Sequence, residues 1–407
     1  MAIIVDLSHV VRWQGRLTGI PRVEYELALR FMQDTNITFV DWQNGAFVKV
    51  NPSIIFSRSQ HEAIQKPVPI GARHILYRFV ASLPFMRRAY RLFRQHIGRR
   101  GEKQIPNQAQ VAIDPGDLLF IGQGLWNDEA YIEAVLQHKA AGGKLVQVVY
   151  DMLPVIAPQF SGHSTAWLEN YGSKIYPQCD LILSISKSTS KDLINWLSSK
   201  SLSAPPIREF RLGEDYAFVK PQKPELRLPK QFLLCVGTIE VRKNHAVLYY
   251  AYKQAKSKQL TLPPTVVVGR RGWRTENIVD VIMSDPDTKD KILLIENASD
   301  EELAWLYTNC RFTIYPSFYE GWGLPIGESM HYGVPCLCSN TSSMPEVARD
   351  AAIYFNPTSA DELLAAMNNL LDDSELRRAK EKVKKYRSVS WDETYAQLRH
   401  QIEGVEK

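Results

Sequence analysis

Short apolar strand patterns alternate with helical patterns along almost the whole 407-residue chain, and this alternation limits the possible folds more than any other feature. Strands that are apolar on both sides are typical of parallel sheets covered by helices. In the first half, strands are expected at 2–7, 37–42, 46–50, 117–122, 144–150 and 180–186. In the second half, they are expected at 231–239, 265–269, 291–295, 312–315, 334–338 and 352–355. Each half therefore predicts its own doubly wound α/β domain.

A linker is predicted between the two halves. Residues 219–230 read VKPQKPELRLPK, with three prolines, four lysine or arginine residues and no apolar periodicity. Such a segment is typical of a domain boundary. We therefore expect a first domain at 1–218, a second domain at 231–385 and a C-terminal segment at 386–407 that is largely helical. Asn44-Gly45 predicts a hairpin inside the first domain.

Composition and charge exclude several classes of protein. The chain is 45% hydrophobic and 23% charged, and its net charge of +5 suits an anionic ligand. The first residues lack the pattern of a signal peptide, and no stretch approaches the roughly 18 apolar residues that span a bilayer. The five cysteines form no CxxC pair and lie mostly in apolar runs, which indicates buried thiols. The cytoplasm is the expected location.

The segment after the strand at 312–315 combines an anion site with two carboxylates. Glu320 precedes Gly321 and Gly323, Pro325 marks a helix start, and Glu328 follows. A loop that enters a helix N-terminus presents unpaired backbone N–H groups to an anion. Carboxylates would repel a phosphate, so we expect them to accept hydrogen bonds from hydroxyls. A ligand with both groups is a sugar nucleotide.

The motif EGWGLPIGE at 320–328 resembles the E-x7-E signature of the retaining glycosyltransferases of family 4. The motifs GVPCLCS (333–339) and MPE (344–346) continue the resemblance. It implies the GT-B fold, in which two Rossmann-like doubly wound parallel-sheet domains face a cleft. The first domain would bind the acceptor, the second the nucleotide sugar, and 386–407 would cross back to the first.

A second motif, GTIEVRKNH at 237–245, supplies positive charge. A strand ends at Gly237, and Asn244 is the expected N-cap of the next helix. Arg242 and Lys243 lie beside that helix N-terminus, where a cation is unfavourable unless an anion compensates. In the family that the chain resembles, the matching Arg and Lys hold the donor diphosphate. Arg can bind phosphate through two hydrogen bonds, while Lys offsets the charge of the leaving group.

These motifs define the predicted site. Glu320 would contact the donor sugar and Glu328 the ribose hydroxyls. The predicted catalytic residues are Glu320, Lys243, Arg242 and Asp151. The predicted donor-binding residues are Gly19, Gly237, Arg242, Lys243, Arg270, Gly321, Trp322, Gly323, Leu324 and Glu328.

Three of these residues keep an alternative interpretation. Gly19, in TGIPRVE (18–24), either lets the backbone approach the donor phosphates or makes a turn before a helix. Asp151 follows a strand and either contacts the acceptor hydroxyl or forms a turn, and Tyr150 stands where many relatives carry His. Arg270 either contacts the nucleotide or is a surface cation.

No metal or other cofactor is expected. Asp285-Pro-Asp287 has a D-x-D form, but it lies away from any strand end and is interpreted as a turn. Basic side chains and a helix N-terminus can neutralise a diphosphate without a cation. No G-x-G-x-x-G follows a strand, which argues against a nicotinamide site.

Residues 73–103 carry nine lysine or arginine residues interleaved with apolar side chains, before and after a single acid, Glu102. They predict either a helix on an anionic membrane surface, peripheral on the cytoplasmic face of the inner membrane, or a basic face packed on the domain. Nucleic-acid binding is not expected, because no matching aromatic platform accompanies these residues.

The resemblance implies transfer of a hexose to a polysaccharide or lipid-linked oligosaccharide, as in bacterial O-antigen, capsule or exopolysaccharide synthesis. The motifs are similar to those of mannosyl- and rhamnosyltransferases, so GDP-mannose is the first donor to test. A sugar-nucleotide epimerase or phosphorylase of the same fold, or a non-catalytic scaffold in a polymer-assembly complex, remains as an alternative.

Overall fold

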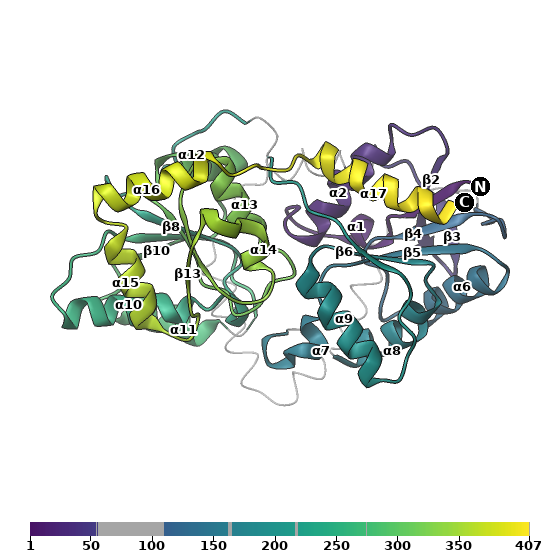
Figure 1. Cartoon of the computed structure of the whole chain (residues 1–407), viewed down its shortest axis with the longest axis horizontal. Coiled ribbons are helices and arrows are strands. Elements are labelled where there is room, and N and C mark those ends of the chain that lie inside the picture. Colours follow the sequence, from purple (N-terminus) through teal and green to yellow (C-terminus); the bar gives the residue numbers. More distant parts are fainter. Residues whose placement is uncertain (54, 56–109, 162–164, 216–218, 274, 407) are drawn as a thin grey trace, which may run out of the picture.

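Two parallel sheets, one in each half of the chain, organise the computed structural model, which describes residues 1–53, 55, 110–161, 165–215, 219–273 and 275–406 (Figure 1). The first described sheet has seven strands in the order β3-β2-β1-β4-β5-β6-β7. Their bounds are β1 Ile3–Asp6, β2 Ile37–Gln43, β3 Ala46–Lys49, β4 Leu118–Ile121, β5 Lys144–Val149, β6 Leu181–Ser184 and β7 Ile207–Glu209. The second described sheet has six strands in the order β10-β9-β8-β11-β12-β13. Their bounds are β8 Leu233–Val236, β9 Thr265–Val268, β10 Ile292–Ile295, β11 Thr313–Tyr315, β12 Cys336–Ser339 and β13 Ile353–Phe355.

The pairing of the strands confirms the predicted fold class. Every described pair of named strands is parallel except β2 with β3, which form the hairpin predicted at Asn44-Gly45. Successive strand residues contribute to the cores on opposite faces of a sheet, as Leu233 and Leu234 do in β8. This burial on both faces is the reason why the strands are apolar throughout.

Helices cover both faces of the sheets. In the first half the principal helices are α1 Ser8–Arg12, α2 Ile20–Phe31, α6 Glu129–Ala140, α7 Leu153–Ile156, α8 Thr165–Ile175 and α9 Lys187–Ser199. In the second half they are α10 His245–Ser257, α11 Glu276–Ser284, α12 Asp300–Asn309, α13 Leu324–His331, α14 Met344–Ala348, α15 Ala360–Asn369, α16 Asp373–Lys384 and α17 Trp391–Glu406.

Strand order reverses at one point in each sheet, and these points locate the sites. In the first sheet, the strands that precede β4 in the sequence extend to one side of β1, and the later strands extend to the other side of β4, so the order reverses between β1 and β4. In the second sheet, the order reverses in the same way between β8 and β11. Ligands of doubly wound sheets bind beyond the carboxyl ends of the strands at such a switch point. A ligand is therefore expected beside the segments that follow β1, β4, β8 and β11.

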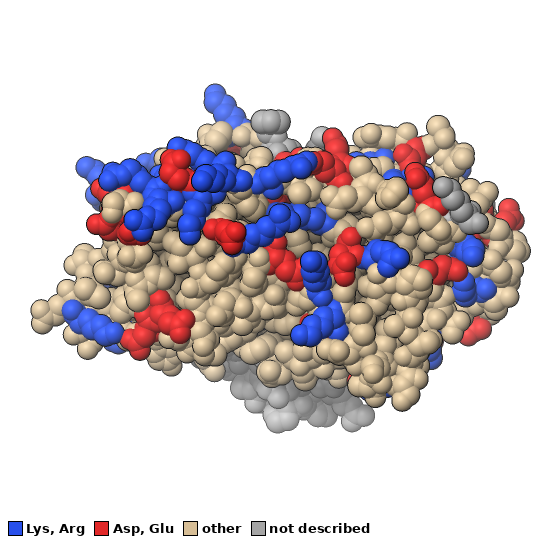
Figure 2. All heavy atoms as spheres, viewed as in Figure 1, with Lys and Arg blue, Asp and Glu red and all other residues tan. Residues whose placement is uncertain are grey.

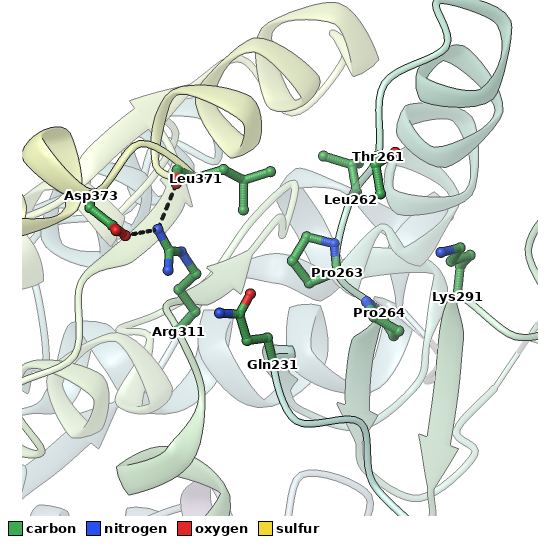
Figure 3. A pocket seen from close by; sticks show the side chains of 9 residues that line it. All are labelled: Gln231, Thr261, Leu262, Pro263, Pro264, Lys291, Arg311, Leu371 and Asp373. Carbon is green, nitrogen blue, oxygen red and sulfur yellow. Dashed lines mark hydrogen bonds and ion pairs between the residues drawn. The ribbon is translucent and has the colours of Figure 1, made fainter.

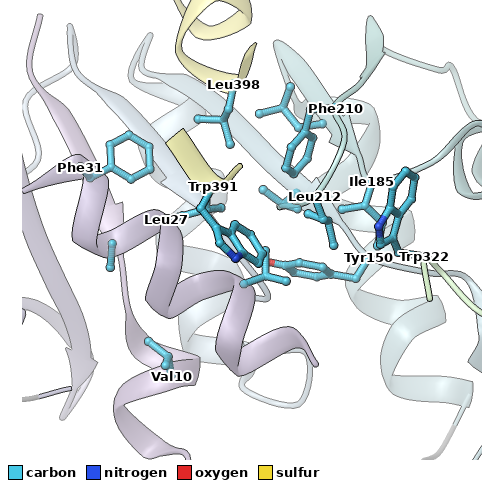
Figure 4. Close-up of a cluster of buried hydrophobic side chains, with 14 of the residues drawn as sticks. Val10, Leu27, Phe31, Tyr150, Ile185, Phe210, Leu212, Trp322, Trp391 and Leu398 are labelled. Carbon is cyan, nitrogen blue, oxygen red and sulfur yellow. The ribbon is translucent and has the colours of Figure 1, made fainter. Parts of the chain in front are cut away.

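The C-terminal helix α17 returns to the first domain, as the family resemblance implied (Figure 1). Arg30 of α2 pairs with Asp392, and the Thr394 hydroxyl donates to the carbonyl of Arg211 at 2.9 Å. Trp391 is buried in a hydrophobic cluster that also contains Leu27 and Trp322, so this cluster joins both halves of the chain (Figure 4). The two lobes thus share one continuous apolar contact.

The ends of several helices test the expected caps. Ser299 and Glu302 form a capping box at the start of α12, and Ser186 caps α9. Ser359 caps α15, but the Glu362 side chain bonds to Asn356 N–H instead of completing a box. Asn244 stands at the N-cap of α10 with a positive φ, yet its amide donates to the carbonyls of Pro316 and Pro357. Asn244 therefore occupies the predicted N-cap position, but its side chain makes no capping hydrogen bond.

No helix in the described part of the chain is long and apolar enough to span a membrane. The expectation for residues 73–103 falls wholly on residues outside the described ranges, and it stays a prediction. Lysine and arginine side chains gather over α16 on the face shown in Figure 2.

Candidate functional site

Two loops meet beyond the switch point of the second sheet. Gly237 follows β8 with a φ of 149°, and the chain then forms a short 3-10 turn at Val241–Lys243. The second loop runs from Pro316 to Gly323, after β11, and Gly323 begins α13 with a φ of 114°. The Phe318 N–H donates to the Arg242 carbonyl at 2.9 Å, which fixes one loop on the other. Both predicted motifs therefore lie at one edge of the sheet.

Arg242, Lys243 and Glu320 form a cluster of charges, called the charge cluster below. Lys243 Nζ donates to Glu320 Oε1 at 2.7 Å, and Arg242 Nη1 donates to Glu320 Oε2. Arg242 also bonds to the Tyr319 carbonyl at 3.0 Å, and Lys243 to the Tyr315 hydroxyl at 2.7 Å. All three charged side chains are largely buried. Their geometry is therefore fixed before any ligand binds.

The charges of this cluster balance within the chain. Burial raises the pKa of Glu320, but Arg242 and Lys243 outweigh burial and bring this pKa down to about 2. Burial lowers the pKa of Lys243, and Glu320 opposes that change. Arg242 also pairs with Glu240 at 2.6 Å, a carboxylate that the sequence reasoning did not include. The anion expected beside these cations is thus supplied in part by Glu320 and Glu240.

Glu328 makes its contacts across the two lobes. Arg22 Nη1, from α2 of the first domain, donates to Glu328 Oε1 at 2.8 Å, and the Tyr307 hydroxyl donates to Oε2 at 2.9 Å. Glu328 is 3% exposed and Arg22 9% exposed. Arg22 Nη2 also reaches the Asp215 carbonyl at 3.2 Å. Both carboxylate oxygens of Glu328, the residue predicted to bind ribose, therefore already accept hydrogen bonds, one of them from the first domain.

Asp151 lies where the first domain meets the loop of Glu320. It follows β5, and its Oδ1 accepts from the Leu153 N–H at 3.0 Å, an arrangement typical of a turn-forming Asp. Burial raises the pKa of Asp151, and the charge of Arg242 opposes this. A Cβ at Gly321 would overlap with the Tyr150 carbonyl oxygen. The loop of Glu320 and the first-domain segment at Tyr150 approach so closely here that only glycine fits at position 321.

Other predicted donor residues are distributed around this contact. Trp322 is buried, with the Arg211 guanidinium 5.7 Å from its ring centroid. Leu324, in the first turn of α13, packs against the hydrophobic cluster that contains Trp322. Gly19 begins α2 with a φ of 59°, and its carbonyl accepts from Arg22 N–H at 3.1 Å. A Cβ at Gly15, not Gly19, would lie 2.9 Å from Arg270 Nη1. The exposed Arg270 therefore faces the first domain at a glycine that the predicted set left out.

Several interdomain contacts were not predicted. The Glu346 carboxylate accepts from the N–H groups of Lys187 and Ser188 at 2.8 and 2.7 Å, and so caps α9 of the opposite domain. The rings of Phe160 and Phe318 stack with centroids 5.0 Å apart. The sequence signal for Glu346 was its place in the MPE motif.

A hollow at the opposite ends of the second-sheet strands carries none of the predicted residues (Figure 3). Gln231, Lys291 and Arg311 line it, and each precedes a strand. Arg311 is bound there to the Leu371 carbonyl and to Asp373. This hollow therefore lies at the amino ends of the strands, whereas the charge cluster lies at their carboxyl ends.

Within the described ranges, no three His, Cys, Asp or Glu side chains converge as they would around a metal ion. Asp285 and Asp287 pair with Lys253 in the predicted turn. Metal independence remains a prediction.

Comparison with known proteins identifies the family of the second domain. Residues 218–386 match the family of glycosyl transferases group 1. This chain is a GT-B glycosyltransferase with a group 1 glycosyl transferase domain. The O-antigen chain mannosyltransferase B of Escherichia coli is 27% identical to this glycosyltransferase over 370 residues, 88% of each chain.

One more sequence relative and one solved structure are also similar to this chain. The serotype-specific mannosyltransferase WbdA of Escherichia coli is 25% identical over 71% of the glycosyltransferase, which spans only 37% of that protein. The crystal structure of Anabaena Alr3699/HepE in complex with UDP has a TM-score of 0.63 at 12% identity, over 99% of the glycosyltransferase and 100% of that chain. This last likeness shows the fold alone. The glycosyltransferase transfers a sugar to a glycan acceptor.

Proposed function

We propose that this glycosyltransferase moves mannose from GDP-mannose to a polysaccharide or lipid-linked oligosaccharide, with retention of anomeric configuration. The names of the two Escherichia coli relatives support mannose as the transferred sugar. The observation that carries the proposal is the charge cluster of Arg242, Lys243 and Glu320, fixed at the switch point of the second sheet.

The charge cluster can serve a diphosphate donor in two ways. A diphosphate brings negative charge that Arg242 and Lys243 can share with Glu320, and it loosens their hold on that carboxylate. Glu320 can then accept hydrogen bonds from the hydroxyls of the donor sugar. As the glycosidic bond breaks, charge grows on the phosphate, and the two fixed cations stabilise it.

Other residues have roles at the edges of this site. In the proposed reaction the acceptor hydroxyl attacks from the face that the phosphate leaves. Asp151 stands on the first-domain wall beside the charge cluster and contacts that hydroxyl. Glu328 accepts from the ribose, Arg270 contacts a phosphate, and the backbone of Gly19 and Gly237 approaches the donor. A lipid-linked acceptor would place the enzyme at the cytoplasmic face of a membrane.

The donor is tested by thermal shift against a panel of nucleoside diphosphate sugars that includes GDP-mannose and UDP-glucose. We expect GDP-mannose to raise the melting temperature most. A larger rise in melting temperature with a uridine nucleotide sugar would refute GDP-mannose as the donor. It would leave the proposed sugar transfer in place, and the same panel would then point to the donor.

The site is tested with Lys243→Ala, which should lower turnover about 10²–10³-fold, as loss of one charge-stabilising donor does. Lys253→Ala is the matched control, because Lys253 is an ion-paired lysine of the same domain outside the charge cluster. Glu320→Gln should abolish transfer and retain nucleotide binding. Near-normal transfer by Lys243→Ala would remove Lys243 from the mechanism.

The alternative functions differ in what happens without an acceptor. An epimerase changes the sugar of the donor, a phosphorylase releases a sugar phosphate when phosphate is added, and a scaffold binds no donor. We expect slow donor hydrolysis alone.

A further inference from the structure

The switch point of the first sheet carries a second pair of charged side chains, which the predicted site does not include. His9 lies on α1, directly after β1, and Glu24 lies on α2. His9 Nδ1 contacts Glu24 Oε2 at 2.5 Å, and the Gln123 N–H donates to Glu24 Oε1 at 2.9 Å. Gln123 follows β4, so the pair occupies the place between β1 and β4 where strand order reverses.

The space for Glu24 is provided by a glycine. A Cβ at Gly122 would lie 2.6 Å from Glu24 Oε1, too close for two unbonded atoms. The Glu24 carboxylate, 5% exposed, therefore sits against the backbone at the end of β4. This geometry leaves His9 on the open side, with its side chain 25% exposed.

The surrounding residues place this pair on the side that faces the second domain. Gly15 lies against Arg270, and Arg16 pairs with Asp300 of α12. Arg22, two residues before Glu24, reaches Glu328. Three first-domain residues that lie between His9 and Glu24 in the sequence therefore approach the opposite lobe.

His9 has one ring nitrogen left for a ligand. Among the described residues, Nδ1 is engaged by Glu24 and no hydrogen-bond partner reaches Nε2. Burial, the largest single influence, lowers the pKa of His9, but the charge and the hydrogen bond of Glu24 together with the charge of Asp6 outweigh burial and raise this pKa, so the ring holds its proton more tightly than an ordinary histidine does. Asp6 strengthens this effect and Arg12 opposes it. A carboxylate that fixes one nitrogen of an imidazole orients the other nitrogen.

A second polar group nearby also has no partner. The buried Tyr150 hydroxyl, at the end of β5, has no hydrogen-bond partner among the described residues. Burial raises the pKa of Tyr150, and the charge of Glu24 adds to this, which indicates that Tyr150 is within electrostatic reach of the pair. Tyr150 belongs to the cluster drawn in Figure 4, where its ring lies between Trp391 and Trp322.

We propose that His9, held in place by Glu24, binds a hydroxyl group of the acceptor glycan in the first domain. The hydroxyl accepts from His9 Nε2–H, which suits a neutral sugar because the protonated imidazole and Glu24 carry no net charge together. This assignment rests on the proposed transferase function. It differs from the role of Asp151, which lies after β5 and not at the switch point. His9 is thus an acceptor-binding residue, and Glu24 is a positioning residue.

The first test separates acceptor binding from donor chemistry. His9→Gln should raise the acceptor KM at least 10-fold, while slow hydrolysis of the donor without acceptor stays within twofold of the wild type. Glu24→Gln should also raise the acceptor KM. His400→Ala is the matched control, an exposed histidine on α17. An unchanged acceptor KM in His9→Gln, or an equal loss of donor hydrolysis, would overturn the assignment.

The second test does not depend on the rate of transfer. The chain has nine histidines, so labelling with ¹⁵N-histidine gives few ring signals, and His9→Gln assigns that of His9. The probes are di- and trisaccharides of mannose, glucose, galactose and rhamnose. A glycan that accepts the sugar should shift the His9 signal. Transfer with an unshifted His9 signal would refute this assignment alone, whereas transfer to no glycan would refute the proposed function and this assignment with it.

Discussion

Replacing Arg22 with methionine removes the cation that holds Glu328 across the two lobes. Methionine keeps much of the aliphatic length of arginine and leaves the packing on Trp391 largely in place. Breaking a buried ion pair from one side costs about 3–5 kcal/mol, because the remaining charge has no partner. Glu328 keeps one hydrogen bond from the Tyr307 hydroxyl, so we expect the lower end, about 3 kcal/mol.

The contribution of the pair itself is measured with a double-mutant cycle. Glu328→Gln in the Arg22→Met background removes the stranded charge, so the double variant should recover part of the lost stability. We expect a coupling energy of about 2–3 kcal/mol, near the upper end for residues in direct contact. Urea unfolding, followed by tryptophan fluorescence and by circular dichroism, gives the free energies if both probes report one transition.

A matched control sets the scale for an exposed pair. Arg378 and Glu375 lie 3.0 Å apart on α16, and Arg378 is largely exposed. Arg378→Met should therefore cost less than about 1 kcal/mol. A coupling energy below 0.5 kcal/mol for Arg22 and Glu328, as small as that of an exposed pair, would show that this pair does not hold the lobes together.

Three further predictions follow from single contacts. Gly321→Ala should force the Tyr150 wall away, raise the radius of gyration in small-angle scattering and lower turnover, whereas Gly116→Ala, where a Cβ meets nothing, should do neither. Ser299→Ala should cost about 1 kcal/mol in urea unfolding through loss of the α12 cap, and an unchanged midpoint would contradict the capping box. The lowered pKa of Glu320, about 2 against 4.5, contributes about 3 kcal/mol above pH 4.5 that is lost as pH falls toward 2. The stability difference between wild type and Glu320→Gln should therefore shrink over that range, and a constant difference would refute the pKa.

The fold could be predicted from the sequence because burial on both faces makes each strand apolar throughout. The strand that was missed, β7, shows the limit of this signal. Ile207–Glu209 is only three residues long and has two exposed side chains at the edge of the sheet. It forms because β6 offers a free edge, and nothing local in the sequence reveals that.

The candidate site could be predicted in part for a similar reason. Gly237 and Glu320 each follow a strand, and parallel strands bring their carboxyl ends to one edge, so the meeting of the two motifs was expected. Their pairing was not, because it depends on side-chain positions. Glu240 lies within the first motif, yet its bond to Arg242 requires the 3-10 turn at Val241–Lys243. The sequence separation of 306 residues between Arg22 and Glu328 hides that contact altogether.

The two glutamates of the E-x7-E motif therefore respond to different events. Glu320 finds its cations within the second domain, so its charge is set once that domain folds. Glu328 finds Arg22 only when the two lobes meet. A donor whose ribose bonds to Glu328 must share that carboxylate with Arg22 or displace it, and either change alters the contact between lobes. We therefore expect donor binding and lobe closure to be coupled through Glu328, and the Arg22→Met variant to change donor affinity while leaving the pKa of Glu320 unaffected.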